Sequence, residues 1–145
     1  STVHTWLGSS NLVKQQHAML HSLLEAISSR LESREKANRS LVSLLNSLAA
    51  HLQTHFEFEE SDDFFANLRR RAPRLTSQVS QLQAEHREML EEVDLLIELA
   101  RIAFVAERAP RELANRYQAF RAKFREHEAT ESRLLEEANR GGVGE

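Results

Sequence analysis

The chain contains no cysteine, few residues that break helices and no long hydrophobic run. Without cysteine among its 145 residues, it can form neither a disulfide nor a cysteine-based zinc or iron–sulfur site. Only 4 glycines and 2 prolines leave few turns, and the Leu-, Ala-, Glu- and Arg-rich composition favours helix. No apolar run approaches the roughly 20 residues that a membrane span needs. These features predict a single helical domain over residues 1–145, large enough to bury a core.

The chain also lacks an excess of positive charge, with 19 Lys and Arg against 22 Asp and Glu. The formal net charge is -3, whereas a nucleic-acid surface would need clustered excess Lys and Arg. Residues 1–10 lack the basic region followed by an apolar stretch that marks a secretion signal. The chain is therefore expected to be cytoplasmic, with no nucleic-acid or membrane partner.

Apolar residues repeat at steps of three and four in four segments, which predicts four amphipathic helices. The first is expected over about residues 10–34 and the second over 39–71, with an irregularity near 61–63. The third is expected to begin near residue 76 and to end before a link at 107–109, and the fourth to span 110–140. Short links make neighbouring helices antiparallel, so the fold class predicted is all-α, an up-down-up-down four-helix bundle. A short N-terminal arm would carry Trp6, and the glycines after Arg140 predict a mobile C-terminal tail over 141–145.

One motif occurs twice at a constant offset. His55 and Glu59 lie 72 positions before His127 and Glu131, within matching apolar ladders. A second offset of 69 places His17 in register with His86. The ladders that match at these offsets are Leu41, Leu45, Leu48 and Leu52 with Leu113, Tyr117, Phe120 and Phe124, and Leu20, Leu24 and Ile27 with Met89, Val93 and Leu96. The chain is thus two copies of one unit, a helix with a lone histidine followed by a helix with His-x-x-x-Glu.

These six residues have the chemistry of a metal site. Residues four apart share one face of a helix, so each motif presents an imidazole and a carboxylate to the core. A buried carboxylate needs a partner, and the matching inward positions offer no Lys or Arg. A lone histidine on an apolar stripe is usually a packed core residue, but two motifs and two histidines in register favour ligation. Four nitrogens and two bridging carboxylates suit two first-row metal ions; iron leads, and manganese or zinc would fit the same ligands.

The neighbouring polar residues are interpreted differently. His21 and His51 each lie one turn from a proposed ligand and have no counterpart in the other repeat, so each is either a hydrogen-bonding partner or an additional ligand. Tyr117 faces the core at a distance that favours packing. The surplus acids near the first motif are expected to be solvated and without a role: Glu57, Glu60, Asp62 and Asp63.

The pattern resembles the haemerythrin-like superfamily, specifically the HHE cation-binding domains, over essentially the whole chain. That family carries a His on the first helix, His-x-x-x-Glu on the second, a His on the third and His-x-x-x-Glu on the fourth. Here His17, His55 with Glu59, His86, and His127 with Glu131 occupy these places. The resemblance implies a bundle with a non-haem di-iron centre, in which the two glutamates and an oxo, hydroxo or water group bridge the two iron ions.

Open positions on such iron would admit a small diatomic ligand or a peroxide. The function predicted is binding, sensing or detoxifying oxygen, nitric oxide or hydrogen peroxide. Two alternatives stay open: a di-iron enzyme for peroxide dismutation or nitric oxide reduction, and iron storage or delivery. Ferritin-like oxidases are disfavoured, because no histidine here is preceded at three residues by Glu.

Overall fold

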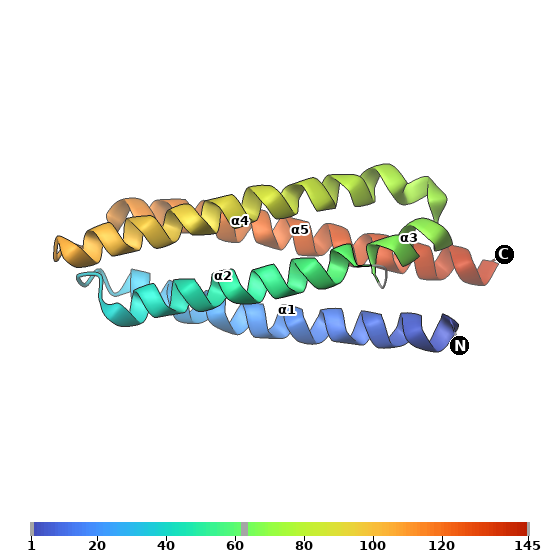
Figure 1. The fold of residues 1–145 in the computed structure, drawn as a ribbon, viewed down its shortest axis with the longest axis horizontal. Helices are drawn as coiled ribbons and strands as arrows, with labels where there is room; N and C mark the ends of the chain where they lie inside the picture. Colours follow the sequence, from blue (N-terminus) through green and yellow to red (C-terminus); the bar gives the residue numbers. More distant parts are fainter. Residues whose placement is uncertain (1, 62–63, 145) are drawn as a thin grey trace.

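The structure is a computed structural model that describes the backbone of residues 2–61 and 64–144, and side chains over 12, 14–61 and 64–140. All regular structure in this part of the chain is helical. Four long helices form a bundle, which confirms the predicted all-helical, four-helix class (Figure 1). The elements are α1 (Thr2–Glu32), α2 (Arg39–Glu60), α3 (Phe65–Arg71), the 3₁₀ turn η1 (Pro73–Leu75), α4 (Thr76–Val105) and α5 (Arg111–Gly144).

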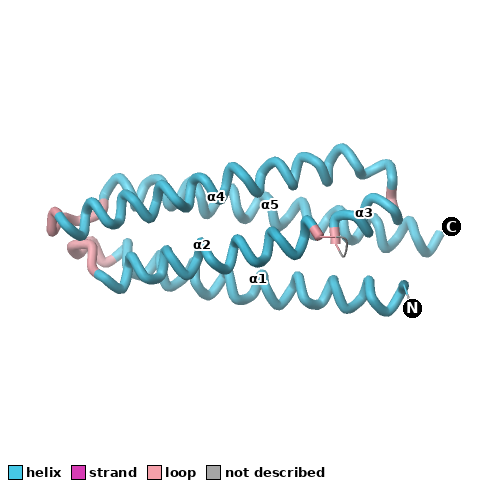
Figure 2. The backbone as a smooth tube through the Cα atoms, in the orientation of Figure 1, coloured by secondary structure: helices cyan, strands magenta, loops and turns pink. Residues whose placement is uncertain are grey.

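The four long helices lie lengthwise beside one another, and each reverses the direction of the one before it (Figure 1). The links at 33–38 and 106–110 lie at the end of the bundle away from both termini (Figure 2). The short helix α3 packs against α5 and α4 at the other end. Within the described residues, none of the helices combines the length and the apolar character that a membrane span requires.

Both ends of the bundle contain more helix than the sequence predicted. α1 begins at Thr2, so helix replaces the expected N-terminal arm; the side chain of Trp6 lies outside the described residues. α5 continues to Gly144, beyond the stop expected at Gly141. The physical reason is that neither segment contains proline, and a glycine weakens a helix by only about 1 kcal/mol relative to alanine. The side chains of 141–145 also lie outside the described residues.

The predicted helix over 39–71 is in fact two helices. α2 begins after Asn38, whose side-chain oxygen accepts a hydrogen bond from the backbone N–H of Leu41 at 2.9 Å. It ends at Ser61, whose hydroxyl donates to the carbonyl of Phe58 at 2.5 Å and so satisfies a free carbonyl of the last turn. The irregularity expected near 61–63 is thus a helix end, and positions 62 and 63 themselves are not described.

The core consists of two apolar clusters with a polar layer between them. The larger cluster follows the predicted ladders of all four long helices, for example through Leu24, Leu48 and Phe124, which are 2 % exposed or less. The smaller cluster joins α3 to the start of α4 and the end of α5. Its buried members are Phe64, Phe65, Leu68, Ala72, Leu75, Val79, Leu82, Leu134 and Ala138. Each long helix contributes histidine or glutamate to the layer between the clusters.

Candidate metal centre

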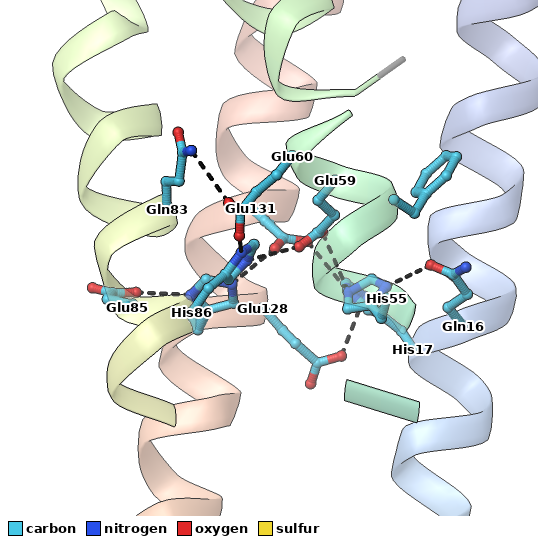
Figure 3. A network of polar contacts seen from close by, with 12 residues as sticks. Gln16, His17, His55, Glu59, Glu60, Gln83, Glu85, His86, Glu128 and Glu131 are labelled. Carbon is cyan, nitrogen blue, oxygen red and sulfur yellow. Dashed lines mark hydrogen bonds and ion pairs between the residues drawn. The ribbon is translucent and has the colours of Figure 1, made fainter. Parts of the chain in front are cut away.

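The polar layer contains all six residues that the sequence singled out. His55, Glu59, His86, His127 and Glu131 are each 1 % exposed or less. His17 completes the set and is the most accessible member, with 15 % of its side chain exposed. The residues come from α1, α2, α4 and α5. Figure 3 shows that His17, His55, Glu59, His86 and Glu131 point toward one another between these helices.

Each glutamate lies between two histidines on different helices. The two oxygens of Glu59 approach Nε2 of His55 at 3.2 Å and Nε2 of His86 at 2.9 Å. Those of Glu131 approach Nε2 of His17 at 3.2 Å and Nε2 of His127 at 2.9 Å. All four rings therefore direct the same nitrogen inward, toward two carboxylates that each span a pair of rings.

These ligand-type atoms gather around two points. His17 and His55 form one group with both glutamates, and His86 and His127 form a second group with the same glutamates. Within each group the donor atoms lie within 4.8 Å of one another. The two groups share both carboxylates, so each half of the repeat brings two histidines to one point and contributes one glutamate to both points.

The inward atoms have no other use within the described residues. Nε2 of all four histidines and both oxygens of Glu59 and Glu131 are buried and make no well-formed hydrogen bond there. Buried polar atoms are rarely left without partners, because each costs about 1–3 kcal/mol. Two cations, one at each point, would satisfy all eight of these atoms together. Imidazole nitrogen with carboxylate oxygen is a donor set that suits iron, manganese or zinc, so the residues present fit a pair of such ions.

Four outer residues hold the histidine rings from behind, through Nδ1. Nδ1 of His55 donates to the amide oxygen of Gln16 at 2.5 Å, and Nδ1 of His86 donates to Glu60 at 2.7 Å. The remaining two contacts run from Nδ1 of His127 to Glu85 at 2.8 Å and from Nδ1 of His17 to Glu128 at 3.2 Å. An acceptor on Nδ1 leaves the lone pair on Nε2, the tautomer that a metal ligand needs.

These outer contacts form a closed ring around the bundle. Each is made between neighbouring helices: α1 to α2, α2 to α4, α4 to α5, and α5 back to α1. Sequence reasoning missed this ring: Glu60 is exposed, as expected of a solvated residue, but its carboxylate also contacts His86, so it was wrong to assign it no role. A signal existed, because each outer residue is adjacent in sequence to an inward one. The adjacent pairs are Gln16–His17, Glu59–Glu60, Glu85–His86 and His127–Glu128.

The two extra histidines lie outside both inward groups of the described part. Nε2 of His21 contacts Glu128 at 2.9 Å, so His21 supports the residue that holds His17. His51 directs Nδ1 to the carbonyl of Ser47 in its own helix, at 2.9 Å. Tyr117 is fully buried and donates its hydroxyl hydrogen to the carbonyl of Leu24 at 2.5 Å, in keeping with a packing position.

Burial and contacts with neighbouring groups together shift the pKa values of the inward groups. It lowers the pKa of His55 to about 3, against attraction from Glu131, and it lowers the pKa of His86 as well. Burial, together with the nearby charge of Glu131, raises the pKa of Glu59 well above its usual range. Burial acts in the same direction on Glu131, but contacts from Glu59, His127 and His17 outweigh it and hold that pKa well below normal. The pKa values of the two glutamates are thus shifted in opposite directions, so Glu59 takes up a proton at a higher pH than Glu131 does.

The shift of His55 predicts a pH dependence in the metal-free chain. Folding lowers the pKa of His55 from 6.5 to about 3. The stability that comes from keeping His55 neutral is therefore fully present above pH 6.5 and is lost as the pH falls from 6.5 toward 3. His55 should contribute up to about 1.4 kcal/mol of unfolding free energy per pH unit over that range. Urea unfolding at several pH values measures it. His55→Gln should flatten this dependence and His51→Gln, one turn away, should keep it; a parental slope in His55→Gln would contradict the assignment.

The family comparison agrees with this geometry. The family model described as Hemerythrin HHE cation binding domain matches residues 9–138. The chain belongs to this family. The match spans all four long helices and all six inward residues of the HHE domain. No curated protein and no solved structure gives a significant match. Membership in a cation-binding family and two convergent His–Glu groups lead to the same coarse conclusion, that this HHE domain binds metal cations.

Proposed function

We propose that this HHE domain holds two iron ions, one at each His–Glu group, and that it binds a small ligand there for sensing or detoxification. The proposal rests on eight buried nitrogen and oxygen atoms that converge on two points. The carboxylates of Glu59 and Glu131 belong to both points. When bound, two iron ions would supply open coordination positions and electrons to oxygen, nitric oxide or hydrogen peroxide. His17 and His55 would hold one ion, and His86 and His127 the other.

The protein's own contribution is to position these groups and to keep water away from them. The outer ring of acceptors fixes each imidazole, so the Nε2 lone pairs already face the two points. Phe56 stacks on the ring of His86 with centroids 3.8 Å apart, and Phe65 follows at 5.3 Å. These rings cover His86, whose side chain is only 2 % exposed.

The first point is reached from outside through a small pocket. A cavity of about 330 Å³ between α1 and α5 is lined by His17 and Glu131, with Lys14 and Ser132 among its other walls. Since a water molecule occupies about 30 Å³ of liquid volume, this space has room for about ten water molecules, which is ample for a diatomic molecule or a peroxide. A diatomic molecule or a peroxide would therefore have access to His17 and Glu131 through this pocket.

Metal analysis with absorption spectroscopy tests the proposal. Chain purified from iron-supplemented cells, or reconstituted with ferrous iron, should contain about two irons per chain, since each point offers two histidines and shares both carboxylates. Its charge-transfer absorption should change on adding azide, nitric oxide or hydrogen peroxide. Rapid consumption of peroxide would place the function among enzymes. A chain that stays metal-free after reconstitution would sink the proposal.

A further inference from the structure

The ring of acceptors behind the histidines contains one exception. Glu60, Glu85 and Glu128 are carboxylates, whereas Gln16, behind His55, offers a neutral amide oxygen. Gln16 and His55 lie close together at the edge of the network, on α1 and α2 (Figure 3). A carboxylate behind a ligating imidazole raises its basicity and strengthens its bond to the metal, and a neutral amide does so less.

The internal repeat supplies a direct comparison for this position. The offset of 69 that pairs His17 with His86 also pairs Gln16 with Glu85. Each of these two residues holds the histidine of the following His-x-x-x-Glu motif, Gln16 holding His55 and Glu85 holding His127. The two halves therefore use the same geometry with different charge, a neutral group in the first half and an anion in the second.

We propose that Gln16 is a positioning residue that makes the His17–His55 position the weaker and more exchangeable of the two metal positions. The inference rests on the proposed function and deepens it, since it assigns different roles to the two halves of one centre. The metal held by His86 and His127 has a carboxylate behind both of its imidazoles. The metal held by His17 and His55 has a carboxylate behind the imidazole of His17 and an amide behind the imidazole of His55.

The surroundings of the two positions favour the same order. The 330 Å³ pocket between α1 and α5 reaches His17 and Glu131, and α1 and α5 are the least closely packed pair of neighbouring long helices in the described residues. The opposite position is covered by the rings of Phe56 and Phe65 against His86. Metal at the first position thus has both a weaker ligand and a more exposed one, since the side chain of His17 is 15 % exposed and that of His86 is 2 % exposed.

Cobalt(II) release to excess EDTA tests the inference, with the cobalt absorption bands as the signal. The parent should bind two cobalt ions and release them at two rates. Gln16→Glu should slow the fast phase about tenfold, within the range known for groups that hold a metal-ligating histidine. Gln15→Glu is the matched control, because it makes the same charge change at the adjacent, exposed position and should leave both rates unchanged.

Glu85→Gln is the reciprocal variant, which gives the second half the amide of the first. It should accelerate the slow phase and leave the fast phase unchanged, and circular dichroism should show a parental helix content for every variant. Release of both ions in one phase, or parental rates in Gln16→Glu, would overturn the inference while leaving the proposed function intact. An equal effect of Gln15→Glu would overturn it too, by showing a general effect of charge. A parent that binds no cobalt would overturn the proposed function itself.

Discussion

Glu59→Gln is expected to abolish tight metal binding while leaving the metal-free fold as stable as the parent. The raised pKa of Glu59 favours the neutral form of its carboxyl group in the metal-free chain, and a glutamine amide of similar shape is neutral as well. Glutamine cannot supply the anionic bridge between His55 and His86. Metal affinity should fall by at least about 100-fold, since even groups behind a ligand are worth 10–100-fold.

Two measurements check this expectation in parallel. Metal analysis after reconstitution should find parental content in the control Glu57→Gln, whose side chain is exposed on the same helix, and a loss in Glu59→Gln. Thermal unfolding in chelator should give similar midpoints for all three chains. Metal should then stabilise only the parent and the control, by about 2.7 kcal/mol at a free concentration 100 times Kd. Full metal content in Glu59→Gln, or a large loss of metal-free stability, would contradict this role of Glu59.

Leu48→Ala is expected to cause the largest loss of stability of the substitutions considered. Leu48 is 0 % exposed on α2, in the larger apolar cluster, so shortening it removes buried methyl groups and leaves a cavity. Such substitutions lower the free energy of unfolding by about 2–5 kcal/mol. Urea unfolding of the metal-free chain measures the change, and the slope of the transition should stay parental.

Leu95→Ala serves as the control for Leu48→Ala. Leu95 lies on α4 and is 38 % exposed, so the same truncation removes fewer buried contacts. Its effect should stay below about 1 kcal/mol, because surface substitutions away from special features change stability little. Equal losses in the two variants would show that the ladder of α2 does not form the centre of the core.

Much of the fold follows from local patterns in the sequence. The three- and four-residue steps of Leu20, Leu24 and Ile27 predicted a buried face, and all three are 2 % exposed or less. Pattern alone located the helix ends less well. Ser61 ends α2 through its own hydrogen bond to Phe58, and no proline or glycine marks that place. The glycines after Arg140 were taken for a stop, yet α5 passes through them.

The inward half of the site was also predictable from the sequence. His55 with Glu59 and His127 with Glu131 are separated by four residues, which is one helical turn, so helix geometry alone brings each pair to one face. Their embedding in apolar ladders placed them in the core. The sequence therefore determined which six residues face inward and that buried carboxylates would need cations as partners.

Only the tertiary structure decided what lies behind those residues. Glu60, Glu85, Glu128 and Gln16 each lie about 100° around their helix from an inward neighbour, where a helical pattern predicts a boundary or exposed position. They acquire a role because the adjacent helix brings a histidine within 2.5 to 3.2 Å. Contacts between helices depend on how the helices are rotated and placed against one another, which periodicity within one helix does not specify. The two halves share the same arrangement of outer contacts, but they differ in charge where Gln16 stands in the place of Glu85.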